Sequence, residues 1–171
     1  MTHHKEISYP PLIRYLDTNG DGTGTKDANG NYSVTPATFY IKPPVNEIYS
    51  ITEFLIHVSD SNNFTITGFG SIAALTNGIN IYAKRNNIIS IDVMDGIPIK
   101  TNPQLLHLTH RVALLDFVAG GNSLAVSFHS DDFGTDLVMH GNLNDTLEVV
   151  LNDDLSGIDD IHFIVHGVIL S

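Results

Sequence analysis

Residues Asp17 to Thr23 read Asp-Thr-Asn-Gly-Asp-Gly-Thr, which places carboxylate or amide oxygens at alternate positions around a glycine. A calcium-binding loop begins in this way, because a calcium ion takes several hard oxygen ligands at once. The complete loop needs a bidentate acid at its twelfth position, which is Ala28 here. The candidate calcium ligands are therefore Asp17, Asn19, Asp21 and Asp27, the last of them one place short of the expected position.

This segment has more than one interpretation. Glycine and asparagine are frequent in residues 19–31, which is typical of a surface loop that needs no ion. No helical pattern flanks the segment, although a calcium-binding helix–loop–helix motif requires one on each side. We therefore favour a plain loop without a metal. The alternatives are a bound hard cation and a segment that becomes ordered on assembly.

The nine histidines raise the question of a transition-metal site. His162 and His166 share one face of a predicted strand but lie about 13 Å apart at ~3.3 Å per residue, too far to bind one ion. His107 and His110 point to opposite faces of another predicted strand. The spacing of histidines that are close in sequence therefore predicts no metal site. A site formed by histidines from separate strands remains an alternative.

Three pairs of acids could in principle supply the carboxylates of a hydrolase. They are Asp131-Asp132, Asp153-Asp154 and Asp159-Asp160. All three pairs fall in predicted turns, where aspartate accepts hydrogen bonds from its own backbone. The chain has no Gly-x-Ser-x-Gly elbow, no P-loop and no dinucleotide fingerprint. We expect no catalytic residues and no cofactor, and we do not expect an enzyme.

The elements that would position these residues are strands. Apolar and polar side chains alternate cleanly at Leu124, Val126 and Phe128, and again at Ile161, Phe163 and Val165. Such alternation indicates strands with one buried face and one face toward solvent or a neighbour. The predicted strands are 39–41, 48–58, 79–83, 88–93, 105–118, 124–128, 147–151 and 161–170.

Turn signals separate these strands at short spacing, as at Asn77-Gly78 and Gly120-Gly121-Asn122. Short strands joined by tight turns predict an all-β, antiparallel β-sandwich with jelly-roll-like connections. A turn or two near Ser71 to Leu75 is the best helical candidate. We expect a short, extended N-terminal arm over residues 1–11 and one sandwich domain over residues 12–171.

The formal net charge is −11, and residues 101–171 hold only Arg111 against ten acids. Such a surface repels phosphate backbones, because nucleic-acid affinity comes largely from Lys and Arg. No apolar run approaches the ~18 residues that span a bilayer. Cysteine is absent, which excludes disulfides and thiolate sites. We therefore expect no nucleic-acid partner and no membrane partner.

Six stretches of the chain form a distinctive combination: Arg14 to Thr25, Tyr32-Ser33, Phe39 to Ile41, Leu75 to Ile79, Asp95 to Asn102 and Leu147 to Leu155. Together they resemble a group of small proteins encoded among the virion genes of tailed bacteriophages. The resemblance covers about residues 12–170. The stretches are turn and strand patterns, so no catalytic residue is carried over from the group.

The resemblance implies a structural virion protein, synthesised in the host cytoplasm. Its first candidate role is a capsid cement (decoration) protein, which stabilises the head by binding at capsomer junctions as a homotrimer. The partners would then be the major capsid protein or other virion proteins. The alternatives are a head–tail connector or tail-associated component and, from another class, a carbohydrate-binding module for host attachment. The absence of Trp counts against the last, since sugar sites usually present aromatic platforms.

The N-terminal arm is the kind of flexible segment that lies across a neighbouring subunit and becomes ordered there. We expect the arm and the loop of residues 17–31 to make the contacts with the partner. The predicted interface residues are Tyr9, Pro10, Pro11, Leu12, Arg14 and Tyr15.

Overall fold

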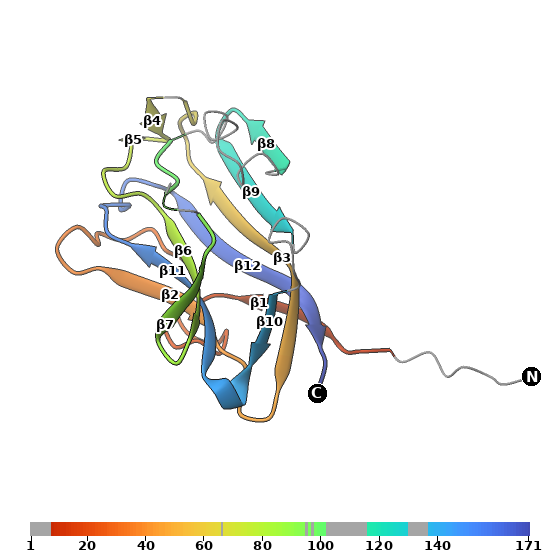
Figure 1. The fold of residues 1–171 in the computed structure, drawn as a ribbon. Coiled ribbons are helices and arrows are strands. Elements are labelled where there is room, and N and C mark those ends of the chain that lie inside the picture. Colours follow the sequence, from red (N-terminus) through yellow and green to blue (C-terminus); the bar gives the residue numbers. More distant parts are fainter. Residues whose placement is uncertain (1–7, 66, 95, 97, 102–115, 130–136) are drawn as a thin grey trace, which may run out of the picture.

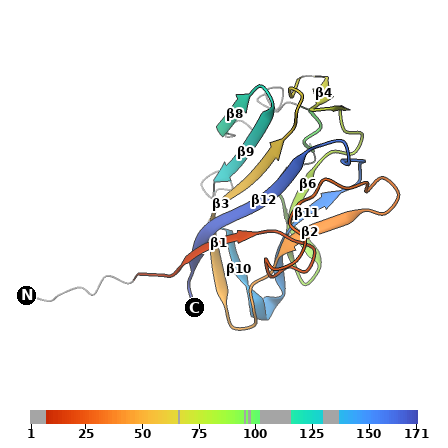
Figure 2. The same cartoon turned by 180° about the vertical axis from the view of Figure 1, so that it is seen from behind.

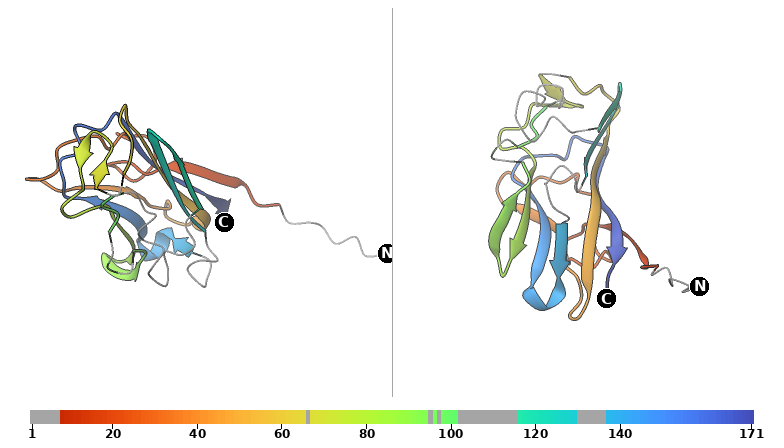
Figure 3. Two further views of the ribbon diagram at one scale, coloured as in Figure 1. Left: turned by 90° about the horizontal axis from the view of Figure 1, so that it is seen from above. Right: turned by 45° about the vertical axis from the view of Figure 1, so that its right-hand side comes forward.

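A computed structural model describes residues 8–65, 67–94, 96, 98–101, 116–129 and 137–171. Figure 1 shows two antiparallel sheets and a small hairpin. The right-hand view of Figure 3 looks nearly along the sheets, so that they appear as two layers. The all-β antiparallel sandwich predicted from the alternation is confirmed.

The larger sheet has the strand order β1-β12-β3-β9-β8, with β10 also pairing with β3. Its centre is the long strand β3, which pairs with β12 along one side and with β9 and then β10 along the other. The bounds are β1 Pro11–Tyr15, β3 Ile48–Ser59, β8 Asp116–Gly120, β9 Ser123–His129, β10 Leu137–His140 and β12 Asp160–Ile169.

The smaller sheet has the order β2-β11-β6-β7. Its strands are β2 Ala37–Ile41, β6 Asn80–Arg85, β7 Ile88–Asp92 and β11 Asp145–Leu151. A hairpin of β4 Gly68–Phe69 and β5 Ile72–Ala73 stands apart, and the 3-10 turn η4, Gly141–Leu143, carries the chain from β10 to β11. The chain crosses between the sheets repeatedly, as from β1 to β2 and from β11 to β12, which gives the sandwich its jelly-roll-like connections.

The core lies between the two sheets and is built by the inward half of each alternating strand. Phe163 of β12 and Phe39 of β2 are buried and contact each other edge to face across the layers, with ring centroids 5.9 Å apart. Leu124, Val126 and Phe128 of β9 are buried in the same core, as their alternation predicts. Packing of this kind must supply most of the stability, because the chain has no disulfide.

Two details of the predicted elements are wrong. Residues 71–75 are not helical, since Ile72 and Ala73 pair with the preceding β4 strand. Pro11 was placed in the arm but is the first residue of β1, where it pairs with Val168 of β12. A five-residue strand with a single fully buried side chain shows too little alternation to be recognised from sequence. The predicted strand of residues 105–118 lies mostly outside the described residues, and β8 contains its last part.

None of the helices in the described part of the chain has the length and hydropathy that crossing a bilayer demands.

An ion pair connects strands β6 and β11 of the smaller sheet. The Arg85 guanidinium donates two hydrogen bonds of 2.8 Å to the buried Asp145 carboxylate. These bonds lower the pKa of the Asp145 carboxyl below its usual value. Because the folded-state pKa lies below the unfolded one, the pair stabilises the fold above about pH 4, and this contribution is lost as pH falls through the folded-state pKa.

We therefore expect Asp145→Asn to lower Tm at pH 7 by a small amount, roughly 2–4 °C. The difference in Tm between the variant and the wild type should shrink as the pH is lowered toward 3. Thermal unfolding followed by circular dichroism over this range measures that difference. A gap that stays constant with pH would contradict a role for the ionised carboxylate.

Candidate functional site

Asp17, the first residue of the calcium-like segment, is a structural anchor of the loop. Its side chain is fully buried, and its two carboxylate oxygens accept hydrogen bonds of 2.6 Å from the backbone N–H groups of Gly20 and Gly24. Its own backbone pairs with Tyr40 of β2 in both directions. Gly20 has a φ of 81°, and a Cβ there would lie 2.0 Å from the Tyr40 ring, so the turn requires glycine at this position.

The other predicted calcium ligands also have local partners. The Asp21 carboxylate accepts from the hydroxyl and the backbone N–H of Thr23, and the hydroxyl bond is the main reason that the pKa of Asp21 is lowered. Asn19 bonds within the same turn. Asp17, Asp21 and Asp27 do not bring their carboxylate oxygens together. The positions of these carboxylates give no support to a calcium ion held by Asp17, Asn19, Asp21 and Asp27, and that alternative stays a prediction.

Asp27 faces away from that turn and toward β12. One of its oxygens accepts the backbone N–H of Ile161 at 3.1 Å and that of Asn29 at 3.3 Å. The backbone N–H of Ala28 in turn donates to the carbonyl of Ile161. The end of the loop is thus fastened to the start of β12, a contact between residues more than a hundred positions apart in the chain.

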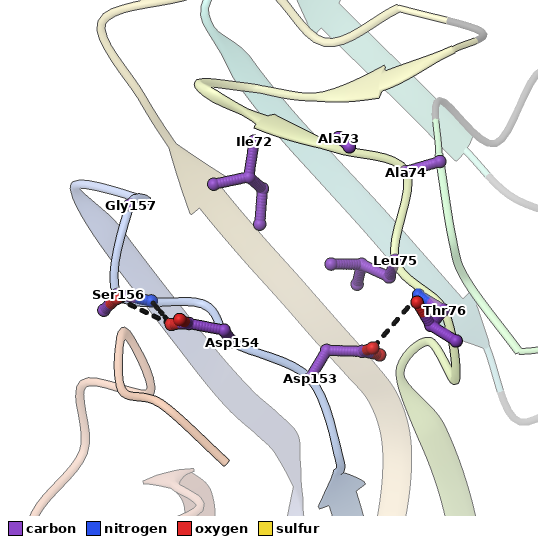
Figure 4. A pocket seen from close by; sticks show the side chains of 9 residues that line it. All are labelled: Ile72, Ala73, Ala74, Leu75, Thr76, Asp153, Asp154, Ser156 and Gly157. Atoms are coloured by element: carbon purple, nitrogen blue, oxygen red, sulfur yellow. Dashed lines mark hydrogen bonds between the residues drawn. The ribbon is translucent and has the colours of Figure 1, made fainter. Parts of the chain in front are cut away.

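An open pocket of about 430 Å³ lies next to the pair Asp153-Asp154, between the β5 region and the turn before β12. Figure 4 shows that Asp153 points toward Thr76 and that Asp154 points toward Ser156. Both Asp153 oxygens accept backbone N–H groups of residues 76–78, and Asp154 accepts from Ser156 and Asn31. These carboxylates serve as caps for the backbone, as the turn prediction proposes, rather than as a pair facing a common substrate. The pair Asp131-Asp132 lies outside the described residues.

The side of the larger sheet that faces away from the core forms a candidate interaction surface. Figure 2 looks onto this sheet with β1 at its edge and the smaller sheet behind it. Its side chains are the alternates of the buried ones, and the strand register arranges them in three rows across β1, β12, β3 and β9. The rows are Ile13–His166–Glu53–His129, Tyr15–Ile164–Leu55–Ser127 and His162–His57–Ala125. We call these residues the outer face.

The outer face combines an apolar centre with histidines at both ends. Tyr15, Ile164 and Leu55 make the central row, and within the described residues no further strand or helix is layered over them. His166 contacts the Glu53 carboxylate at 2.8 Å, and His162 contacts Tyr15 edge to face. His162 and His166 share one strand face without approaching each other, as their spacing predicts. His107 and His110 lie outside the described residues.

The predicted interface residues divide into exposed and buried ones. Tyr9, Pro10, Pro11, Arg14 and Tyr15 are all exposed, along the segment that leads into β1 and along β1 itself. Leu12 is fully buried in the core, so its assignment to the interface is wrong. It occupies an inward position of β1, whereas the neighbouring Ile13, which the sequence did not single out, is 61% exposed.

Strand β1 and the loop of residues 17–31 lie side by side. Ile13, Arg14 and Tyr15 line an open hollow of about 410 Å³ whose other wall is residues 21–23 and Lys26. The Lys26 ammonium lies 5.2 Å from the centre of the Tyr15 ring, an attractive cation–π contact. The exposed edge of the larger sheet and the glycine-rich loop thus form one continuous surface.

Comparison of the chain with protein-family models, with curated proteins and with solved structures found no match.

Proposed function

We propose that this protein is a structural component of a tailed-phage particle, a cement protein that stabilises the head by binding where capsomers meet. The observation that carries the proposal is the outer face, with its apolar row of Tyr15, Ile164 and Leu55 on an open sheet. A cement protein needs a rigid scaffold with surfaces that other subunits bury, and it needs no enclosed pocket. The sequence resemblance to small virion proteins points to the same class.

The size of the outer face indicates that a second surface must contribute. Four strands at ~4.8 Å spacing and three rows of side chains cover roughly 400 Å². A stable interface buries about 800 Å² on each partner, twice that area. The exposed edge of β1, the adjoining loop and the segment Ser8–Pro10 lie beside the outer face and supply the additional contacts in this proposal.

The assembly we propose is a homotrimer on the outside of the shell. Among the strands that the structure describes, β1 pairs with β12 on one side only, so its other edge offers backbone groups for pairing. An edge of this kind is covered either by a neighbouring copy or by the capsid protein. Burying the outer face and this edge together would leave the acidic turns before β12 toward solvent.

The location of the protein on particles tests this proposal directly. Cryo-electron microscopy of purified particles, together with light scattering of the free protein, should show trimers spread over the shell at capsomer junctions. A single ring of copies at one vertex would instead establish the connector role. A monomer that binds glycans and no particle would replace the proposal with host attachment.

A substitution in the centre of the outer face should separate binding from folding. We expect Ile164→Lys to weaken binding to particles by at least about tenfold, because a charge would be buried in an apolar contact. The fold should persist, since this side chain points away from the core. Co-sedimentation with particles measures binding, and circular dichroism monitors folding.

Ile88→Lys is the matched control, because Ile88 is a 72% exposed isoleucine on β7 of the other sheet. Binding should be unchanged in this variant. Full binding by Ile164→Lys, or an equal loss in both variants, would exclude the outer face as the contact surface.

A further inference from the structure

Three potential metal ligands meet at one corner of the outer face. Asp27 from the end of the loop approaches Asp160 and His162 from β12, and one ligand atom from each lies within 4.8 Å of the other two. All three side chains are half-buried, so they are partly shielded and still reachable from solvent. No two of the three are adjacent in sequence, and Asp27 is brought in by the tertiary fold.

Backbone hydrogen bonds orient Asp27, and the geometry of strand β12 places the other two side chains. The Asp27 carboxylate is oriented by the N–H groups of Ile161 and Asn29, which donate to one of its oxygens. Asp160 and His162 are two positions apart on β12, so they project from the same face of the strand. Hydrogen bonds that orient a carboxylate ligand in this way are a regular feature of metal sites.

The His162 ring faces oxygen acceptors on both sides. Its Nε2 lies 2.8 Å from an Asp160 oxygen, and its Nδ1 lies 3.4 Å from the carbonyl oxygen of Lys26. A neutral imidazole has only one N–H, so it can donate to one of these oxygens and not to both. Both contacts are satisfied by a doubly protonated imidazolium, or by a metal ion bound to Nε2 while Nδ1–H donates to the carbonyl, the usual partner of a ligating histidine.

We propose that Asp27, Asp160 and His162 bind a divalent transition-metal ion of the zinc class. One imidazole nitrogen and two carboxylate oxygens suit zinc, which takes His and Asp ligands at about 2.0–2.2 Å. Calcium requires six to eight oxygens and does not favour imidazole. Three protein ligands leave at least one coordination position for water or for a group from a neighbouring subunit.

The bound ion would add a link between two parts of the chain that hydrogen bonds already connect. It would tie the end of the glycine-rich loop to β12, beside His162 on the outer face. Because metal affinity for the folded state adds to folding stability, zinc should raise Tm. The inference does not depend on the proposed virion role, since it concerns the isolated chain.

Isothermal titration calorimetry with zinc chloride tests the site in the full chain. The measurements use a background with His3→Gln and His4→Gln, so that these two neighbouring histidines do not bind the ion. We expect one zinc ion per chain and a rise in Tm. His162→Ala and the isosteric Asp160→Asn should each weaken zinc binding at least about tenfold.

His166→Ala is the matched control, because His166 lies on the same strand face and also contacts a carboxylate, that of Glu53. Zinc affinity should be unchanged in this variant, and calcium chloride should give no binding to any of the proteins. Circular dichroism without metal establishes that each variant is folded. Absence of one-to-one zinc binding, or equal loss in His166→Ala and His162→Ala, would overturn the proposal.

Discussion

Replacing Gly167 by alanine should lower the free energy of unfolding by more than about 3 kcal/mol. Gly167 lies in β12 where the register with β3 shifts, so that Thr52 is left over between Ile51 and the next paired residue. An added Cβ would lie 2.0 Å from the carbonyl oxygen of Ser50 and 3.1 Å from Cα of Ile51. These are backbone atoms of the central strand, so the clash can be relieved only by separating the two strands.

Urea unfolding of the wild type and of Gly167→Ala gives the difference in free energy. Gly68→Ala is the control, because Gly68 also lies in a strand but its Cβ would meet the Thr65 hydroxyl at 3.2 Å, and that side chain can rotate away. The control should retain most of its stability. If Gly167→Ala were as stable as the control, the close approach of β12 and β3 at this bulge would be incorrect.

Replacing Asp153 by alanine should cost about 3–4 kcal/mol of stability, because charged groups make strong hydrogen bonds and buried N–H groups without partners are costly. The largely buried Asp153 carboxylate accepts the backbone N–H groups of Thr76, Asn77 and Gly78, the last at 2.7 Å. It fastens the turn before β6 to the turn after β11. Alanine has no oxygen that can accept, so the backbone N–H groups of all three residues would lose this acceptor.

Asp154→Ala provides the comparison within the same turn. The exposed Asp154 accepts from Ser156 and Asn31, and water can replace the aspartate at both contacts. We expect little change in the urea midpoint for this variant and a large decrease for Asp153→Ala. Equal decreases would mean that the turn as a whole, rather than the buried carboxylate, determines the stability.

The local chemistry of the turns is readable from sequence. Asp17 was singled out for its oxygens, and its partners Gly20 and Gly24 are three and seven positions away. An aspartate followed by glycines favours such a turn whatever the rest of the chain does. Whether those oxygens face an ion or backbone N–H groups depends on the tertiary structure. Asp17 is buried and its backbone pairs with Tyr40, and its oxygens accept backbone N–H groups.

Strand β1 shows why a short strand escapes notice. Residues 11–15 read Pro-Leu-Ile-Arg-Tyr and carry one fully buried side chain, Leu12, so the two-residue alternation that identifies a strand is missing. The segment becomes a strand because β12 offers an open edge whose hydrogen bonds it completes.

The fold class, the position of most strands and the buried side of the strands that alternate cleanly follow from the sequence alone. A two-residue alternation is a local property, and it appears at Ile161, Phe163 and Val165 without knowledge of any partner. The pairing of the strands, their register and the side chains that meet across them depend on the three-dimensional packing. The tertiary structure places His162 opposite His57 and beside Asp27, because long-range packing selects one register among those that keep the same residues buried.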